Sequence, residues 1–491
     1  MAEDELLQFR RDKLAALEAA GVDAFPARFP VDGTVERFRG QYDETSAEAL
    51  DEEGPIVRLA GRMTALREHG KSAFSDLDDG TERIQCHLRQ KLLGDEAYQR
   101  WLDLDLGDFV GVEGQLFRTR TGELTVRVDR WEFVAKALRP MPEKWHGLKD
   151  TEVRYRQRYL DLLANPDVRA LFRRRAEIVR TLRSHLDAND FLEVETPTLQ
   201  PLYGGATARP FKTHHNTLDQ DLYLRIAPEL YLKRLLVGGL QRVYDLNRNF
   251  RNEGISRQHN PEFTMLEFYA AYWDYAQMMD FGEELMCLAF GQADGVDGIV
   301  YQDTELSLHR PWPRVPLRQA LLDYGEMDAA VVDDEDALRA FLTENEVNTD
   351  GLGHGAMQEA ALDKLVKPRL QSPVFITEYP LEISPLSKAS PDNPEIVERF
   401  ELYMGGMEVA DGFSELNDPR EQSRRFHEQV EDRGDDEEIP PAVDEDYVTA
   451  LEHGMPPAAG IGIGIDRLVM LATDSPTIRD VILFPLLRQR D

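Results

Sequence analysis

The sequence predicts an α+β protein in which a small β-barrel precedes a large domain built on an antiparallel sheet flanked by helices. Between residues 54 and 140, short apolar runs alternate with turn residues, a pattern typical of small barrels. From residue 168 onward, a long helical pattern is followed by intermingled strands and helices. We therefore divide the chain into an N-terminal helix and linker (1–53), the barrel (54–140), a second linker (141–167) and the large domain (168–491), with a mostly helical insertion near 300–370.

The composition indicates a globular chain with two or more domains, because it has 491 residues of which 42% are hydrophobic. No apolar run approaches the roughly 20 residues that span a bilayer, and the charged N-terminus lacks the apolar core of a signal peptide. The two cysteines, Cys86 and Cys287, are too few for a disulfide framework or a cysteine zinc site. We expect both to be buried, and the protein to be cytoplasmic and free of membranes.

The net charge of −34 is strongly acidic but unevenly distributed. Residues 54–140 contain 14 Lys+Arg and 14 Asp+Glu, whereas residues 144–183 contain 11 basic and 5 acidic residues. The excess acid lies elsewhere, notably in residues 333–344 and 431–438. A solvated acidic shell, as in proteins adapted to high salt, is one interpretation that the sequence leaves open, because net charge reports on solubility and not on fold.

The barrel segment has five expected strands with a helix after the third, which is the element order of an OB-fold. OB-folds commonly bind single-stranded nucleic acid, although this pattern alone is a weak signal. The expected strands lie at 56–66, 72–80, 83–88, 109–117 and 124–128, and the expected helix lies at 91–104.

Two consecutive strands of the large domain gather polar side chains on one face, because alternate residues of a strand point the same way. The first, residues 241–253, places together Asp245, Asn247, Asn249, Arg251 and Glu253. The second, residues 261–269, adds Phe263, Met265, Glu267 and Tyr269, and the loop between the strands holds Arg257, His259 and Asn260. A face with so many charges is costly to bury unless it binds a ligand.

Near the C-terminus, the run AAGIGIGIDRLVML (458–471) alternates glycine and isoleucine. Gly460, Gly462 and Gly464 share one strand face and leave it bare, so that a flat ligand can lie against the backbone. Arg467 then opens a helix. A dinucleotide-binding glycine loop is excluded, because the third glycine of that pattern is replaced by Ile465 or Arg467.

A third segment, residues 400–419, contains a hairpin that turns at Gly405-Gly406. Pairing across this turn places Tyr403 opposite Glu408, with Glu401 as the diagonal neighbour of Glu408. Two converging glutamates suit Mg²⁺, which is held by one or two carboxylates together with phosphate oxygens wherever a triphosphate binds.

The stretch 248–269, RNFRNEGISRQHNPEFTMLEFY, resembles motif 2 of class II aminoacyl-tRNA synthetases and is very close to bacterial lysyl-tRNA synthetases. Residues 458–471 resemble motif 3. The expected helix 169–186 with the following FLEVETPTL resembles motif 1, which forms the homodimer interface in this family. The resemblance extends from about residue 10 to 490, and it implies an OB-fold barrel followed by a class II catalytic domain.

This resemblance implies an ATP site in which Arg251 clamps the α-phosphate and the amino-acid carboxylate, and Arg467 holds the γ-phosphate. It places Glu253 on the adenine amine and Phe263 on the base. The remaining implied ATP contacts are His259, Asn260, Glu401 and Gly464, with Mg²⁺ on Glu401 and Glu408.

The substrate is decided by the side-chain pocket, in which three carboxylates need a cation. By resemblance, Glu229 and Glu415 hold the ε-ammonium of lysine beside Tyr269. Glu267 and the backbone of Gly204-Gly205 take the α-amino group, and Phe413 lines the alkyl stem. An aspartyl enzyme would need cations here instead.

Asp411 departs from the family pattern, because lysyl enzymes usually have Asn at this position near the substrate carboxylate. We expect a modest penalty in lysine affinity, unless Asp411 is turned away or protonated. Strand parity also puts Glu408 and Asp411 out of phase, so a β-bulge near Gly412 is expected if both reach the site.

In the barrel, the resemblance assigns Arg67, Phe74 and Gln85 to the central anticodon base, through stacking and hydrogen bonds. The whole sequence therefore predicts a lysine–tRNA ligase that forms lysyl-adenylate from L-lysine and ATP and transfers lysyl to the 3′ end of tRNA-Lys. The alternatives are an aspartyl- or asparaginyl-type synthetase, and a non-catalytic RNA-binding protein with a relic domain.

Overall fold

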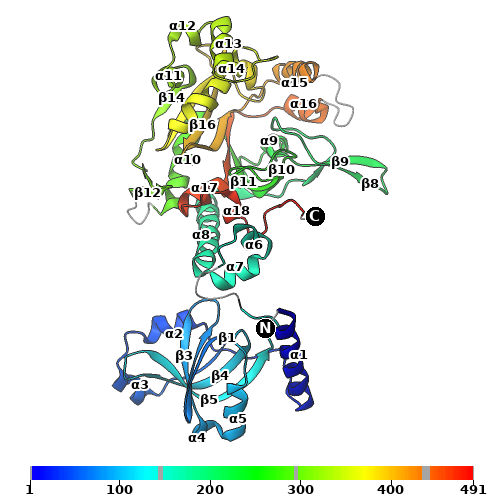
Figure 1. Ribbon diagram of the computed structural model, residues 1–491. Coiled ribbons are helices and arrows are strands. Elements are labelled where there is room, and N and C mark those ends of the chain that lie inside the picture. Colours follow the sequence, from blue (N-terminus) through cyan, green and yellow to red (C-terminus); the bar gives the residue numbers. More distant parts are fainter. Residues whose placement is uncertain (1–2, 142–147, 292–296, 434–442, 490–491) are drawn as a thin grey trace. The chain divides into compact units, whose positions relative to one another are not determined.

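The computed structural model describes residues 3–141, 148–291, 297–433 and 443–489. They form two compact units, one of residues 1–149 with 159–165 and one of residues 150–158 with 166–491 (Figure 1). Residues 142–147 of the second linker and 434–438 of the acidic run lie outside the described residues. Among the described helices, none has the length and apolar character needed to cross a membrane.

The first unit is a closed five-stranded barrel in the order β1-β2-β3-β5-β4, which confirms the OB-fold prediction. Alternating residues of each strand fill its interior, and Cys86 is among them. The buried Trp101 of α5 donates from Nε1 to Ser75 Oγ at 2.9 Å. The elements are β1 (Ile56–His69), β2 (Ser72–Asp78), β3 (Arg83–Arg89), α4 (Gln90–Leu93), α5 (Asp95–Leu102), β4 (Phe109–Arg118) and β5 (Leu124–Ala135).

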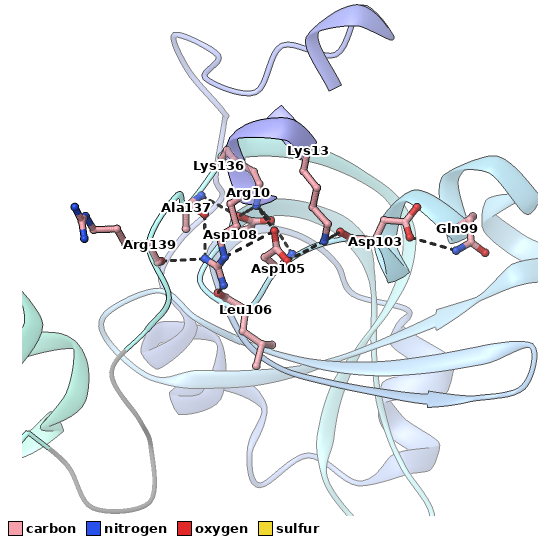
Figure 2. A network of polar contacts seen from close by, with 10 residues as sticks. All are labelled: Arg10, Lys13, Gln99, Asp103, Asp105, Leu106, Asp108, Lys136, Ala137 and Arg139. Carbon is pink, nitrogen blue, oxygen red and sulfur yellow. Dashed lines mark hydrogen bonds and ion pairs between the residues drawn. The ribbon is translucent and has the colours of Figure 1, made fainter. Parts of the chain in front are cut away.

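The N-terminal helix α1 (Glu3–Ala19) is fixed to the barrel by a polar network (Figure 2). Lys136 of the chain just after β5 lies 2.6 Å from Asp105 and 2.8 Å from the fully buried Asp108. Lys13 of α1 reaches Asp105 at 2.8 Å. Arg10 donates to the backbone carbonyls of Leu106, Ala137 and Arg139. Helices α2 (Val35–Tyr42) and α3 (Ala47–Glu53) complete this N-terminal segment.

The second unit is built on an eight-stranded sheet in the order β14-β15-β16-β17-β18-β11-β10-β6. The six central strands are antiparallel, as expected, whereas β14 and β6 at the two edges run parallel to their neighbours. The strands are β6 (Leu192–Glu193), β10 (Arg242–Phe250), β11 (Glu262–Ala271), β14 (Arg314–Pro316), β15 (Val374–Pro380), β16 (Ile396–Met404), β17 (Met407–Ser414) and β18 (Ala458–Gly464).

One face of this sheet packs against α8 (Pro166–Ala188), α10 (Tyr275–Phe290) and α17 (Ile465–Ala472) to form the main core. Ile461, Ile463 and Ile465 are buried in that core, as the glycine–isoleucine alternation predicts, and so is Cys287. The opposite face is therefore left for the polar residues. The helices α9 (Glu229–Val237), α15 (Pro419–Arg433) and α16 (Glu445–Glu452) pack together beside the start of β10 and the end of β11.

The remaining elements are short or peripheral. Residues 300–370 contain helices but also strands. The buried side chains from Leu317 onward form a separate core with β15 and β16, whereas Tyr301, Leu306, Leu308 and Trp312 belong to the main core. The elements are α6 (Thr151–Arg156), α7 (Arg158–Ala164), β7 (Leu199–Gln200), β8 (Lys212–His215), β9 (Gln220–Leu224), β12 (Gly298–Tyr301), β13 (Thr304–Ser307), α11 (Leu317–Asp323), α12 (Ala329–Val332), α13 (Glu335–Glu344), α14 (His354–Ala361), η2 (Leu362–Val366), η3 (Lys367–Arg369), η4 (Leu381–Ile383) and α18 (Ile478–Val481).

Candidate active site

A cavity of about 690 Å³ lies on the polar face of the second unit's sheet. Strands β11, β17 and β18, helix α9 and the loop after β10 contribute its walls. Of the residues that the sequence assigns to ligands in this domain, all but Glu401 line the cavity: Gly205, Glu229, Arg251, Glu253, His259, Asn260, Phe263, Glu267, Tyr269, Glu408, Asp411, Phe413, Glu415, Gly464 and Arg467.

Arg251 lies just beyond the end of β10, where its backbone N–H donates to Pro261 O at 2.9 Å. The guanidinium lies over the ring of Phe263, 5.1 Å from the ring centroid. Its Nε atom is buried without a hydrogen-bond partner among the described residues. Burial lowers the pKa of Arg251, although Glu408 and Glu253 oppose this effect. A buried cation with an unmet donor suits an anionic ligand.

Arg467 of α17 approaches the same end of the cavity. Its Nη1 donates to Glu408 O at 2.6 Å, and its Nη2 donates to His259 Nε2 at 3.1 Å. Because arginine has only donors, His259 Nε2 must accept, and its Nδ1–H then donates to Ser256 Oγ at 2.8 Å. Burial and the charge of Arg467 lower the pKa of His259, which fits this neutral form.

The glycine strand β18 runs beside β11 with Gly460 opposite Tyr269 and Gly462 opposite Glu267. A Cβ atom at residue 460 would lie 2.3 Å from Tyr269 Cε1 and 2.5 Å from Glu415 Oε1. The face that was predicted to be bare at this position is therefore covered by protein side chains. Tyr269 and Glu415 both lie against the backbone of Gly460. At Gly462 the nearest atom, Glu267 Cγ, is 3.5 Å away, so that position has room.

The hairpin of β16 and β17 pairs Tyr403 with Glu408, as predicted. A bulge follows at Val409, between the pair Tyr403–Glu408 and the pair Leu402–Ala410. The expected bulge is therefore present, but it lies three residues before Gly412. Its effect is to bring Asp411 directly opposite Glu401, so that both residues share the site face with Glu408.

Glu401 and Glu408 differ in their surroundings. Glu401 is buried, accepts from Arg399 Nη2 at 2.5 Å and also accepts from Tyr403 Oη. Burial raises the pKa of Glu401 to about 8. Burial also acts on Glu408, but Arg467 and Lys367 outweigh it and lower its pKa. Within the described ranges, no group of three or more His, Cys, Asp or Glu side chains is placed to hold a metal by itself.

Three buried carboxylates, Glu229, Glu267 and Glu415, meet at the other end of the cavity. Tyr269 Oη donates to Glu267 Oε2 at 3.2 Å. Burial raises the pKa of Glu267 to about 8, and the charge of Glu229 adds to this effect. Glu415 Oε1 is buried with no hydrogen-bond partner in the described parts of the chain. This end of the cavity is therefore an anionic pocket in which one buried carboxylate oxygen, Glu415 Oε1, has no donor among the described residues.

On the barrel, the three predicted anticodon residues share one outward face. Arg67 is paired in register with Phe74, and Gln85 with Asp76. Phe74 is half-buried, whereas its neighbours in β2 point into the core, so it is not a core residue. The ring of Phe74 stacks on His87, with centroids 4.4 Å apart and planes at 5°.

Known families match both units. The family described as tRNA synthetases class II (D, K and N) matches residues 150–488, and an OB-fold nucleic acid binding domain matches residues 57–134. The chain is similar over its full length to curated proteins named lysine–tRNA ligase. That of Carboxydothermus hydrogenoformans is 50% identical over 99% of both chains. That of Moorella thermoacetica is 49% identical over 100% of this chain and 99% of its own.

The chain belongs to the lysine–tRNA ligase family. The lysine–tRNA ligase of Bordetella bronchiseptica is likewise 49% identical over 100% of this chain and 98% of its own. The aspartyl and asparaginyl alternatives share the class II family but not these full-length relatives, and the intact cavity argues against a relic domain. The match from residue 150 also covers α6 and α7 of this lysine–tRNA ligase family member.

Sequence reasoning missed three residues that lie at the candidate sites. Lys233 lies one helical turn after Glu229 on α9, and its Nζ is 2.5 Å from Glu229 Oε1. Arg399 pairs with both Glu401 and Asp411. Helical i,i+4 spacing could have revealed Lys233, and strand parity with Glu401 could have revealed Arg399. The same parity, counted from Gln85, places His87 on the barrel face of the predicted anticodon residues.

Asp411, where lysine–tRNA ligases usually have Asn, faces the cavity and is not turned away from it. Its Oδ1 accepts from Arg399 Nε at 3.1 Å. Burial and Glu408 raise the pKa of Asp411, while Arg399 opposes them. The chain thus places a cation beside the unusual carboxylate, so its charge does not face the substrate uncompensated.

Proposed function

We propose that this chain joins L-lysine to tRNA-Lys in two steps that take place in the cavity. A lysine carboxylate oxygen attacks the α-phosphorus of ATP, and pyrophosphate leaves. A hydroxyl of the 3′-terminal adenosine of the tRNA then attacks the acyl carbon, and AMP leaves. The observation that carries the lysine assignment is the anionic pocket of Glu229, Glu267 and Glu415, in which Glu415 Oε1 has no donor among the described residues.

The roles of the cations follow from their positions. Arg251 and Arg467 occupy one end of the cavity, whereas the three carboxylates occupy the other. A lysine whose carboxylate faces Arg251 has its two ammonium groups toward the carboxylates, with Phe413 along the alkyl stem. No side chain acts as nucleophile, so the rate comes from orientation and from neutralising charge on the phosphates.

Glu401 and Glu408 are proposed to hold Mg²⁺ together with the ATP phosphates. The donor set fits, because both are carboxylates on adjacent strands, and two carboxylates plus phosphate oxygens satisfy this ion. Burial raises the pKa of Glu401 to about 8 although Arg399 opposes this effect, so a bound Mg²⁺ would further favour the ionised carboxylate. When bound, the ion would neutralise negative charge on the phosphates. Arg399 and Tyr403 position Glu401 for this role.

The barrel face of Arg67, Phe74, Gln85 and His87 is proposed to bind the anticodon. Phe74 and His87 present stacked rings for a base, and Arg67 and Gln85 supply hydrogen-bonding groups. Because stacking is worth about 1–3 kcal/mol per base, Phe74→Ala should lower kcat/KM for tRNA by roughly 5- to 150-fold. Lysine activation without tRNA should change far less. Equal losses in both assays would contradict the anticodon role.

A homodimer in the cytoplasm is proposed through the motif 1 segment. Leu192 and Leu199 in this segment are 51% and 47% exposed, and Leu202 just after it is 37% exposed. Such apolar side chains suit a covering partner. Light scattering on the purified chain tests the assembly. A mass of about one chain at micromolar concentration would contradict it.

ATP–pyrophosphate exchange with each of the twenty amino acids tests the substrate. We expect exchange with lysine and little with any other amino acid. Exchange with aspartate or asparagine but not with lysine would overturn the proposal. Omitting Mg²⁺ should abolish the exchange.

A further inference from the structure

Lys233 is a cation that the proposed mechanism does not use. It lies on α9 and is fully buried. Its Nζ is 2.5 Å from Glu229 Oε1 and also pairs with Glu415 Oε2. It lies 5.0 Å from the centroid of the Phe413 ring. Lys233 is not among the described residues that line the cavity, so it lies behind the carboxylates and not between them and a ligand.

The pairing with Lys233 uses one oxygen of each carboxylate and leaves the other for the cavity. Glu229 Oε2 is 3.6 Å from the position that a Cβ at Gly205 would take. Glu415 Oε1 lies against the bare backbone of Gly460 and has no hydrogen-bond partner in the described ranges. Both Gly205 and Gly460 line the cavity. Lys233 therefore orients two acceptors toward the ligand.

The charges of this cluster can be compared with those of a substrate. Glu229, Glu267 and Glu415 carry three negative charges when ionised, and Lys233 supplies one positive charge. The remaining charge of −2 balances the +2 carried by the two ammonium groups of lysine. An amino acid with an uncharged side chain brings only one ammonium group and would leave one buried carboxylate without a cation, which is costly.

We infer that Lys233 is a positioning and specificity-determining residue, which sets the charge of the pocket to match a substrate with two ammonium groups. The inference rests on the proposed lysine site. Burial raises the pKa of Glu415, and among the groups that act on Glu415 the charge of Lys233 opposes this effect most strongly. Lys233 itself stays protonated, because the charges of Glu229 and Glu415 outweigh its burial and raise its pKa.

This charge balance makes an unusual prediction about pairs of substitutions. Glu229→Gln alone leaves the pocket at −1, which is one charge short for lysine. Lys233→Met in the same chain restores −2, so it should rescue the first change. We expect the double variant K233M/E229Q to bind lysine roughly tenfold more tightly than E229Q, as a directly contacting charge pair allows. If Lys233 served only to fill space, the two losses would add.

Titration calorimetry of the full-length chain with L-lysine tests this prediction for the unsubstituted chain, E229Q, K233M and the double variant. Lys212→Met serves as the matched control, because Lys212 on β8 pairs with the exposed Asp221 on β9, and neither residue lines the cavity. We expect K233M to bind at least tenfold more weakly than the unsubstituted chain, and K212M to bind equally well.

The decisive comparison, E229Q against the double variant, does not require K233M alone to fold. A double variant that binds lysine no better than E229Q overturns the inference, and so does one that fails to fold while E229Q folds. If the unsubstituted chain itself binds no lysine, the proposed function fails instead. These outcomes separate the two claims.

Discussion

Gly460→Ala tests whether the glycine strand shapes the proposed lysine pocket. The added Cβ would lie 2.3 Å from Tyr269 Cε1 and 2.5 Å from Glu415 Oε1, whereas ordinary contacts begin at 3.4 Å. Tyr269 is only 3% exposed and packs against neighbouring side chains, so its ring has to move by roughly 1 Å. Overpacking of this kind costs about 1–3 kcal/mol. If that cost falls on the pocket, lysine binding weakens by roughly 5- to 150-fold, at about 1.4 kcal/mol for each factor of ten.

The assay is the KM for lysine in ATP–pyrophosphate exchange, together with the melting temperature of the chain. Gly462→Ala is the matched control, because its Cβ meets Glu267 Cγ at 3.5 Å and Met265 Sδ at 3.6 Å. It adds the same methyl group to the same strand face without forcing a side chain to move. We expect its melting temperature to stay close to that of the unsubstituted chain. A Gly460→Ala chain with both its KM for lysine and its melting temperature unchanged would refute the steric reasoning.

Three further predictions follow from the charges. Burial raises the pKa of Glu267 to about 8, so this carboxyl group is protonated in the empty pocket at neutral pH. The KM for lysine should therefore fall as the pH rises from 6.5 to 8 and Glu267 ionises, whereas a flat profile would contradict this. Asp411→Asn should change the KM for lysine less than about threefold, because Arg399 already balances the carboxylate. A larger decrease in the KM would instead support the repulsion between Asp411 and lysine that the sequence suggested. Lys136→Met leaves the buried Asp108 without its ammonium partner and should destabilise the barrel by about 3–5 kcal/mol. Lys13→Met, at a part-exposed position, should cost less than about 1 kcal/mol, and scanning calorimetry measures both effects.

The sequence was sufficient wherever a short repeat fixes the geometry. Period-two alternation placed Glu267 and Tyr269 on one face and Ile461 and Ile463 on the other, because a strand offers only two faces. The turn at Gly405-Gly406 fixed the hairpin register as far as Tyr403 and Glu408. Beyond that pair the extra residue Val409 shifts the register. The sequence showed that Glu408 and Asp411 are out of phase and that a bulge is needed between them, but it did not show where the bulge lies.

The sequence was insufficient where a site depends on which segments meet. Glu229 and Glu415 are 186 residues apart, and only the fold brings Lys233 between them. Sequence reasoning counted the carboxylates of the pocket and assigned all of them to the substrate. The buried partners Lys233 and Arg399 change that count, because a carboxylate with a permanent cation does not present its full charge to a ligand.

Strand β11 runs from the cationic end of the cavity to its anionic end, and so separates the sites proposed for the nucleotide and for the ammonium groups of lysine. Its site-facing residues run from Phe263 beside Arg251, through Glu267, to Tyr269 beside Glu415. At about 3.3 Å per residue, Phe263 and Tyr269 are roughly 20 Å apart along the strand. The cationic and aromatic end thus suits the nucleotide and the anionic end suits ammonium groups, while the reacting carboxylate and phosphate would meet between them. Exchanging the charge at one end alone should therefore impair binding of one substrate, whereas any change in the spacing along β11 should impair the reaction of both.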